Sequence, residues 1–549
     1  MLLQRALGVF WGFLGFLGPA PSPRFVRSEE APHKGPRRWS PPRPRPLTQP
    51  ASRQPALRPL TQPGARQPAL RPTRLQRKRE AAMRKAVDAY ARDDHAEARS
   101  RQRAAAAELK ALQASGARIF SVTEFGAAGD GATDDAGAFR SAVAAARAFA
   151  AADRAAPSSP RLKRPVVHVP QGRYLLSIMS LAHVDGIDVR IDGNVVAPEM
   201  AAFNAAPAED AALSPEVQRM RYAFFEIANS TRVRVGGGGS IDGRGRPWWR
   251  VRKRRPFTRA PVLLLIRNCI DVDVSLLELR SSPFYHLVIL ESDRVALSRL
   301  NVSSPAGSVN TDGIDVLASR NVRIDDCWVS TGDDNVAIKE GSSYVEVRGG
   351  CFARGHGLSI GSLGEGGIEA SVRHVALSDV RFVRTTNAAR VKTWQGGRGA
   401  VENVSFSRLR VAGVGIPVII DQFYCPASQH AATCANETDA VAIKDVTIDG
   451  VTGWHTSGVA AMLHCSDSSP CTVSLRNLDV RPQAGCSNVV RCWSVAPAPR
   501  GGRAARADPC ARGNAMHGYV FDLSRRERQK VARNFSCIYP PEPLAGDVR

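Results

Sequence analysis

Four short polar clusters recur at nearly constant spacing in the middle of the chain, and this spacing limits the folds open to it. The clusters are Asn310-Thr311-Asp312, Gly332-Asp333-Asp334, Gly355-His356-Gly357 and Arg390-Val391-Lys392. The steps from Asp312 to Asp333 and from Asp333 to His356 are 21 and 23 residues. A period of this size, with a few short strands in each repeat, is typical of a solenoid. Equivalent positions on stacked parallel strands lie about 4.8 Å apart, so we expect three carboxylates and a histidine to converge on one outer face.

Short apolar triplets support the same interpretation. Each triplet has one apolar residue on either side of a polar residue or an alanine, which is the pattern of a half-buried strand. The triplets start 23 to 42 residues apart and are Val295–Leu297, Val322–Ile324, Val345–Val347, Val375–Leu377, Val404–Phe406 and Val446–Ile448. The longer gaps predict loops, and we expect the Gly-rich stretch 361–367 to rim a cleft. The chain is therefore predicted to be an all-β solenoid.

The four clusters, in this order and at this spacing, resemble the polygalacturonases of glycoside hydrolase family 28. The family pattern is N-T-D, D-D, G-H-G and R-I-K, and this chain differs only by Val391 in the last cluster. A lone Asp-Asp is usually a turn and a lone Arg-x-Lys a solvated surface, whereas four clusters in order are a strong signal. The resemblance implies a right-handed parallel β-helix. It also implies an inverting hydrolase of α-1,4-linked galacturonic acid in pectin (homogalacturonan), which acts in carbohydrate metabolism and cell wall modification.

Hydrolysis of a glycosidic bond needs a proton for the leaving oxygen and a base for water. The resemblance makes Asp333 the general acid, while Asp312 and Asp334 hold and activate water. His356 is expected to hydrogen-bond Asp333. Crowding of three carboxylates should raise at least one pKa and so keep the acid protonated. The adjacent aspartates reach one face only if Gly332 breaks the strand into a turn.

Substrate contacts are expected from the remaining cluster residues. Arg390 and Lys392 point to one face and can bind the substrate carboxylate, which favours galacturonate over a neutral sugar. The resemblance adds Tyr424 and Asn310 as substrate contacts, and Gly357 lets a sugar approach closely. No cofactor is expected, and no metal site is predicted because no Cys or His cluster has zinc spacing.

The first 118 residues differ in composition from the rest of the chain. They hold 24 Lys+Arg and 8 Asp+Glu, so they carry +16 of the chain's net charge of +24. Residues 1–20 predict a signal peptide, because Arg5 precedes the apolar run Ala6–Gly18 and small residues follow. The run of 13 residues is short for a membrane span. An uncleaved anchor or the first half of a bipartite organelle signal is the alternative.

The remaining segments complete the predicted domain organisation. Residues 21–74 are Pro- and Arg-rich, repeat with a period of 13, and are predicted to be a disordered linker or pro-segment rather than a basic tether to an acidic wall polymer. Residues 75–118 predict a charged, solvated helical linker, since they lack a clear apolar stripe. Residues 119–549 form the predicted β-helix domain.

A Gly/Asp turn at Phe125–Asp135 precedes an Ala-rich stretch that predicts a helix ending near Ala152. This arrangement resembles the amino-terminal cap of pectin-degrading β-helices, in which a helix covers the open end of the core. Asp134 and Asp135 are therefore expected to cap the helix rather than to act in catalysis.

All 11 cysteines lie at Cys269 or later, and secretion would favour disulfides. The best local pairs are Cys425 with Cys434 and Cys465 with Cys471, and the odd count leaves at least one thiol unpaired. Relatives of the family often bridge a Cys after the paired aspartates to one before G-H-G. Asn335 stands at the first position here, so Cys351 is expected to lack that partner.

Glycosylation sequons stand at Asn229, Asn301, Asn403, Asn436 and Asn534.

The predicted partner is an acidic polysaccharide, pectin or polygalacturonate, which suits the positive balance of the chain. We expect a secreted, extracellular monomer at the cell wall, with no nucleic acid bound and no stable membrane insertion once the signal is cleaved. Two alternatives stay open. One is a hydrolase of a decorated pectin (rhamnogalacturonan or xylogalacturonan), and the other is a non-catalytic polysaccharide-binding β-helix. The sequence leaves endo and exo action open as well.

Overall fold

The computed structural model describes residues 96–155, 164–203, 215–256, 258–425, 439–483 and 488–496. The predicted signal peptide at 1–20, the predicted disordered segment at 21–74, and the residues Cys434, Asn436 and Asn534 lie outside this range. No helix among the described residues is long and apolar enough to cross a membrane.

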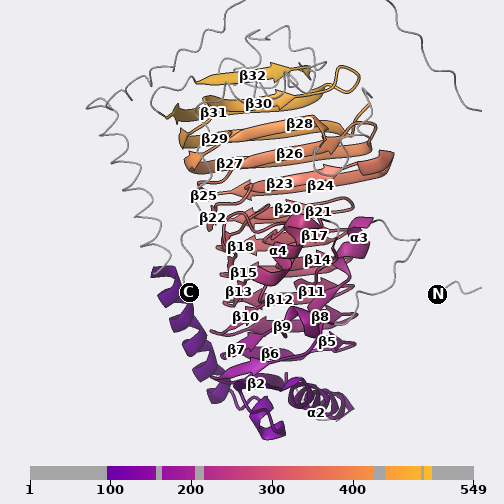
Figure 1. Cartoon of the computed structure of the whole chain (residues 1–549), viewed down its shortest axis with the longest axis vertical. Helices are drawn as coiled ribbons and strands as arrows, with labels where there is room; N and C mark the ends of the chain where they lie inside the picture. The colour runs from indigo at the N-terminus through magenta and orange to yellow at the C-terminus, as the bar shows by residue number, and fades with distance from the viewer. Residues whose placement is uncertain are drawn as a thin grey trace, which may run out of the picture. The chain divides into compact units, whose positions relative to one another are not determined.

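The described strands form a parallel β-helix, as predicted, with three strand columns stacked along one axis (Figure 1). The first column is an 11-stranded sheet that carries the candidate site. Its strands are β5 (Met179–Ala182), β8 (Ala223–Ala228), β11 (Val262–Arg267), β14 (Leu287–Leu290), β17 (Ile314–Leu317), β20 (Val336–Ile338), β23 (Leu358–Leu363), β26 (Ala389–Trp394), β28 (Val418–Tyr424), β30 (Val459–His464) and β32 (Val489–Trp493).

Within each of the other two columns the strands pair in parallel with their neighbours, and both columns belong to one 22-stranded sheet. The second column contains β1 (Ile119–Ser121), β3 (Val166–Val169), β6 (Asp188–Ile191), β9 (Thr231–Gly236), β12 (Ile270–Ser275), β15 (Asp293–Ser298), β18 (Arg320–Asp325), β21 (Ser343–Arg348), β24 (Glu369–Ser378), β27 (Arg398–Val414), β29 (Ala442–His455), β31 (Cys471–Pro482) and β33 (Val495–Ala496). The third contains β2 (Asp130–Asp134), β4 (Arg173–Leu175), β7 (Asn194–Val196), β10 (Ser240–Asp242), β13 (Glu278–Arg280), β16 (Asn301–Ser303), β19 (Trp328–Ser330), β22 (Cys351–Ala353) and β25 (Arg381–Val383). The long strand β27 pairs with both β24 and β25, so the two columns merge there.

The predicted apolar triplets form one stacked ladder in the second column. Val295 pairs with Val322, which pairs with Val345, and the same register continues through the later triplets. The two apolar residues of each triplet are buried in a core that runs through the whole stack. Burial of apolar surface thus fixes the register, because a slip of one residue would turn these side chains outward.

The helix α2 (Ala136–Ala155) closes one end of this core, as predicted, and ends three residues later than expected. Its buried face includes Ala142 and Phe139, whose ring meets that of Phe225 edge-on at 5.9 Å. The Asp134 carboxylate accepts a hydrogen bond from the backbone N–H of Ala136 at 3.0 Å, so this aspartate caps the helix as predicted. The short helix η1 (Val122–Phe125) packs beside α2 at the same end.

Residues 96–114 are helical and contact the β-helix. Arg190 donates a hydrogen bond to the backbone oxygen of Ala105, and Arg299 donates one to the Ser100 hydroxyl at 2.8 Å. Ala105 is buried, while most other residues of this helix are at least partly exposed. The described part of the charged helix thus lies against the strands and is not fully solvated.

Two helices, α3 (Pro215–Met220) and α4 (Arg246–Arg254), cover the outer face of the site-bearing sheet (Figure 1). Trp248 of α4 packs in a buried cluster with Val262 and Val288, which lie on β11 and β14. The remaining described helical turns are η2 (Met200–Ala202) and η3 (Glu365–Gly367), the latter in the Gly-rich stretch.

One predicted disulfide lies fully within the described residues. Cys465 and Cys471 are bonded, with their Cα atoms 5.6 Å apart, as predicted. The buried thiols of Cys269 and Cys327 are free.

Candidate active site

Asp312, Asp334 and His356 occupy equivalent positions on three successive turns of the β-helix. Each stands two residues before a strand of the first column, and the register pairs Ile314 with Val336 and Val336 with Leu358. The repeat therefore takes two equal steps of 22 residues through Asp334. The predicted steps of 21 and 23 residues through Asp333 were wrong by one position, because a bend displaces Asp333 from the stack.

The bend at Gly332 brings both neighbouring aspartates to one side, as predicted. Nδ1 of His356 lies 3.0 Å from the carboxylate of Asp333 and 3.4 Å from that of Asp334. Gly332 is needed for space rather than for a left-handed backbone conformation. A Cβ atom at this position would lie 2.3 Å from the backbone oxygen of Ser308 on the preceding turn.

Asp334 is buried and held by donors on both carboxylate oxygens. Lys392 Nζ contacts Oδ2 at 2.8 Å, and the Ser359 hydroxyl donates to Oδ1 at 2.9 Å. Arg390 reaches Oδ1 at 3.5 Å. Burial would raise the pKa of Asp334, but the charges of Lys392, His356 and Arg390 hold it well below its usual value. The charged neighbours thus favour the ionised form of Asp334.

Asp333 and His356 are the exposed members of the group. Their side chains are 23% and 34% exposed, whereas that of Asp334 is 2% exposed. Burial would raise the pKa of Asp333, but the neighbouring His356 imidazolium lowers it. Burial would lower the pKa of His356, yet Asp333 raises it to about 9. The expectation that crowding keeps Asp333 protonated is therefore wrong for the free protein, because His356 holds the proton.

The raised carboxyl pKa belongs to Asp312. This residue is 4% exposed, and its Oδ1 has no hydrogen-bond partner within the described chain. Burial, together with the nearby charges of Asp333 and Asp315, raises its pKa well above the usual range. The crowding of carboxylates thus places one proton on Asp312, which is buried like Asp334 but has no ion pair among the described residues.

Replacing His356 with glutamine is expected to change how stability depends on pH. The folded-state pKa of about 9 lies above the ordinary value of 6.5, so the charged contacts of His356 stabilise the fold fully below pH 6.5. This contribution is lost as the pH rises through 9. Urea unfolding from pH 6 to 10 should show the wild type losing stability relative to His356→Gln. A constant difference across this range would contradict the assignment.

The predicted substrate contacts lie on the following turns of the same column. The Arg390 guanidinium and the Lys392 ammonium lie 5.7 Å and 5.4 Å from the centre of the Tyr424 ring. Trp394 meets the same ring edge-on at 5.6 Å. The four side chains form a group beside the carboxylates in which two cations face an aromatic surface.

The glycine at 357 serves the stacking of the turns. Gly357 has a left-handed φ of 83°, and a Cβ there would lie 2.2 Å from the backbone oxygen of Asn387 on the next turn. Its N–H donates to the Asn335 side chain at 2.9 Å. These contacts give Gly357 a structural reason that differs from the predicted one, the close approach of a sugar.

A second arginine of the site was missed from the sequence. Arg252 of α4 is 5% exposed, and its guanidinium lies 4.5 Å from the centre of the Phe284 ring. It donates a hydrogen bond to Asn310 Oδ1 at 2.8 Å, and Asn310 Nδ2 contacts Asp333 Oδ2 at 3.4 Å. Arg252 lies four and three residues after Trp248 and Trp249, which would place the three side chains on one helical face. This spacing was the sequence signal that could have identified Arg252 as a buried residue near the site.

The group of Asp333, Asp334 and His356 has the donor atoms for a metal ion, which lie within 4.8 Å of one another. The chemistry of the set favours a proton network instead. A protonated imidazole has no lone pair to offer a metal, and Lys392 already compensates the charge of Asp334.

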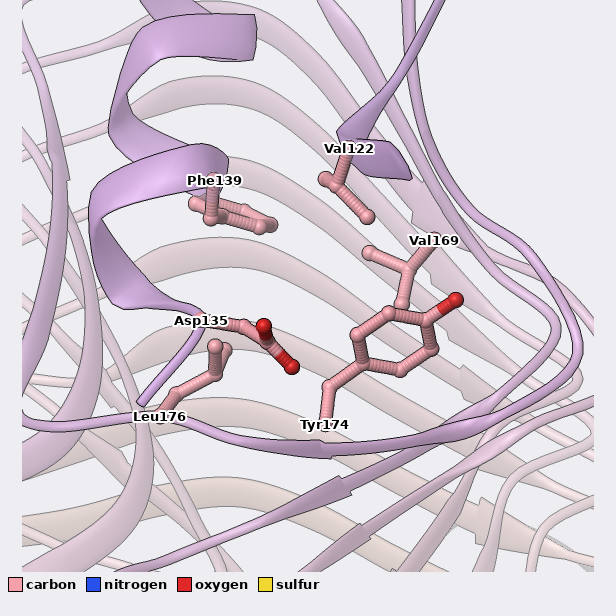
Figure 2. Close-up of a pocket in the computed structure, with 6 residues that line it drawn as sticks. All are labelled: Val122, Asp135, Phe139, Val169, Tyr174 and Leu176. Atoms are coloured by element: carbon pink, nitrogen blue, oxygen red, sulfur yellow. The ribbon is translucent and has the colours of Figure 1, made fainter. Parts of the chain in front are cut away.

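A buried pocket at the capped end is separate from this group (Figure 2). It is lined by Phe139 and Tyr174 among others, and the Asp135 carboxylate points into it. That carboxylate accepts hydrogen bonds from the N–H groups of Ala128 and Gly129 at 2.7 and 3.1 Å. Asp135 therefore stabilises the turn before α2 with its side chain and does not cap the helix, so the predicted cap is correct for Asp134 and wrong for Asp135.

Comparison with known proteins agrees with the fold. Acids that converge on successive turns of a parallel β-helix can supply the acid and the base that glycoside hydrolysis needs. Residues 161–496 match the family model described as Glycosyl hydrolases family 28. The chain belongs to this family and is a glycoside hydrolase.

The relatives found include two curated plant proteins and one solved structure. A protein of Arabidopsis thaliana named "probable polygalacturonase" is 33% identical over 69% of this chain and 81% of its own length. The polygalacturonase of Chamaecyparis obtusa is 32% identical over 67% of this chain and 68% of its own. The crystal structure of endo-xylogalacturonan hydrolase from Aspergillus tubingensis is similar with a TM-score of 0.58 at 22% identity, over 70% of this chain and 100% of its own, which shows the shared fold.

Proposed function

We propose that this chain is a polygalacturonase that hydrolyses α-1,4-linked galacturonic acid in pectin with inversion. The observation that carries the proposal is the convergence of three aspartates and His356 with Arg390 and Lys392, one turn after another. The acids supply the chemistry of glycoside hydrolysis, and the cations suit a sugar that carries a carboxylate. The curated relatives described above carry the polygalacturonase name.

Asp333 is the general acid in this proposal. A general acid must touch the leaving oxygen, and Asp333 is the most exposed of the three carboxylates. In the free protein the shared proton rests on His356, 3.0 Å away. A bound galacturonate brings negative charge into the site and raises the pKa of Asp333. Asp333 then takes up a proton, from His356 or from solvent, and passes it to the leaving oxygen.

Asp334 and Asp312 hold and activate the attacking water. Asp334 stays ionised because Lys392 and Arg390 compensate its charge, so it can accept a proton from water. Asp312 lies one turn earlier and offers Oδ1, which has no other hydrogen-bond partner among the described residues. Carboxylate oxygens of Asp333 and Asp334 lie within 4.8 Å of each other, which is shorter than the about 6.5–9.5 Å usual between the acid and the base of an inverting enzyme. The inverting outcome is therefore proposed from the family resemblance and not from this separation.

Arg390, Lys392 and Tyr424 bind the substrate. Lys392 has three N–H donors and Arg390 has five, so both can bind a sugar carboxylate while they contact Asp334. The Tyr424 ring gives the sugar an apolar surface beside these cations. Asn310 binds substrate next to Asp333, and its backbone takes a left-handed φ of 50°.

The wild-type protein is expected to release reducing ends from polygalacturonate faster than from rhamnogalacturonan or xylogalacturonan. Proton NMR of the first product should show the β-anomer at the new end, because inversion changes the α-linkage. A product profile on the long polymer separates exo action, which gives monomer alone, from endo action, which gives mixed oligomers. Release of the α-anomer first, or of no reducing ends, would overturn the proposal.

Arg252 is a positioning residue in this proposal, because it contacts Asn310 and not the reacting atoms. Arg252→Gln is expected to lower kcat by about 10- to 100-fold with a smaller change in KM, since a shifted catalytic group costs rate. Loss of the cation should also raise the pKa of the nearby acids and so move the acidic limb of the pH–rate profile upward. Arg252→Lys should keep that limb in place, and an unchanged profile in Arg252→Gln would exclude the role.

We further propose that the enzyme is secreted as a monomer and acts on pectin in the cell wall. The proposal rests on the apolar run Ala6–Gly18 and on the acidic wall polymer as substrate. The proposed segments are a signal peptide at 1–20, a disordered linker or pro-segment at 21–74, a helical segment at 75–118 and the catalytic β-helix at 119–549. Amino-terminal sequencing of the secreted protein tests the cleavage site.

A further inference from the structure

Helix α4 presents a row of exposed cations on one face. Arg246, Arg250, Lys253 and Arg254 stand at i, i+4, i+7 and i+8, the spacing of one helical face, and all four are exposed. The helix RPWWRVRKR contains no acidic residue, and none of the four has an ion pair within the part of the chain that the structure describes. We call these four residues the α4 basic face.

The opposite face fixes this helix against the β-helix. Trp248, Trp249 and Arg252 are buried, and the Trp249 indole N–H donates to the backbone oxygen of Ser282 at 2.9 Å. The backbone of α4 is therefore held in place, so the four cations stay on one exposed face. Like charges at i and i+4 destabilise a helix, so the α4 basic face costs stability that a bound anion would offset.

Exposed cations elsewhere on the described surface often have acidic partners. Arg294 pairs with Asp271, and Arg408 pairs with Asp379 at 2.7 Å. Helix α4 instead gathers four cations without ion pairs among the described residues on one face, and such a local excess attracts a polyanion more strongly than a balanced surface does.

Helix α4, which carries the α4 basic face, lies beside the catalytic group along the stack, on the side away from Arg390 and Lys392. Helix α4 packs over β11 and β14, while the acids stand before β17, β20 and β23 (Figure 1). Arg390 and Lys392 follow on β26. The contact between Arg252 of α4 and Asn310 joins the helix directly to the site. A polymer laid along the stack would thus meet cations before and after the acids.

We propose that the α4 basic face binds galacturonate units of the substrate chain several sugars away from the scissile bond. The surface would select long runs of free galacturonate, because methyl-esterified units carry no charge for it to bind. This inference rests on the proposed function and adds to it a binding surface outside the catalytic group. It predicts that a long polymer gains affinity from α4, while a short oligomer does not.

The double variant Arg250→Gln/Arg254→Gln tests this surface. We expect its KM for long, de-esterified polygalacturonate to rise about threefold to tenfold with little change in kcat, as for the loss of two surface ion contacts. Its kcat/KM on trigalacturonate should stay within about twofold of the wild type. The matched control is Arg140→Gln/Arg147→Gln on the capping helix α2. It removes two exposed cations that have no ion pair with any described residue. This control variant should keep the wild-type KM for the polymer and the wild-type kcat/KM on trigalacturonate.

A charge-retaining variant and the salt dependence complete the test. Arg250→Lys/Arg254→Lys should keep the wild-type KM for the polymer, and added NaCl should raise that KM more in the wild type than in the glutamine variant. Equal KM values for the polymer in the wild type and the glutamine variant would overturn the inference. So would a loss of kcat/KM on trigalacturonate in the glutamine variant as large as its loss on the polymer. If the wild type released no reducing ends, the proposed function would fail. Electrophoresis through a gel containing polygalacturonate would still show whether the glutamine variant binds the polymer more weakly.

Discussion

Replacing Asp333 with asparagine should lower kcat on polygalacturonate by about 10²- to 10⁴-fold, the usual contribution of a general acid. Asparagine has nearly the same shape as aspartate, and its Oδ1 can still accept the hydrogen bond that the backbone N–H of Asp334 donates at 2.9 Å. The bend at Gly332 should therefore persist. The variant loses the ability to give a proton to the leaving oxygen while KM changes little. Initial rates of reducing-end release over a range of substrate concentrations measure both constants.

Two controls separate this loss from damage to the fold. Asp379→Asn removes an exposed carboxylate that pairs with Arg408 on another column, and it should leave kcat unchanged. In Asp333→Asn the pKa of His356 should fall below its wild-type value of about 9, because Asp333 is the largest influence that raises it. NMR titration of the imidazole follows this shift. Unaltered kcat in Asp333→Asn would remove Asp333 from the role of acid.

The sequence predicted the architecture because the period of the clusters and the apolar triplets both report the stacking of the strands. Val322 and Val345 are buried neighbours in one ladder, as the triplets indicate. The spacing alone did not decide whether Asp333 or Asp334 occupies the stacked position of its turn. Spacings of 21 and 23 residues through Asp333 differ little from two spacings of 22 through Asp334, and only the bend decides between them.

The electrostatics of the site could not be predicted from spacing alone. The proton falls on Asp312 because that residue is enclosed, and burial depends on the packing of neighbouring turns. Arg252 comes from a helix 58 residues before Asn310, and no periodicity links the two. The local disulfide between Cys465 and Cys471 was predictable because its two cysteines are only six positions apart in the sequence.

Removing the partner of a buried carboxylate should have the largest effect on stability. Lys392→Met leaves the 2%-exposed Asp334 without its contact at 2.8 Å, and breaking such a buried pair costs about 3–5 kcal/mol. Arg390 remains 3.5 Å away, so the lower end of this range is expected. The pKa of Asp334 is lowered in the fold, so its stabilising contribution is present above the unfolded pKa and is lost as the pH falls. The destabilisation should therefore be largest near pH 7 and shrink below about pH 4.

The double variant Asp334→Asn/Lys392→Met decides whether the uncompensated charge is the cause. It removes both charges and should recover much of the stability that Lys392→Met loses, while kcat stays low because the base for water is gone. Lys444→Met breaks an exposed pair with Glu402 at 3.8 Å and should cost no more than about 1 kcal/mol. Urea unfolding followed by tryptophan fluorescence compares the variants. A double variant as unstable as Lys392→Met would show that Lys392 stabilises the fold by packing and not by its charge.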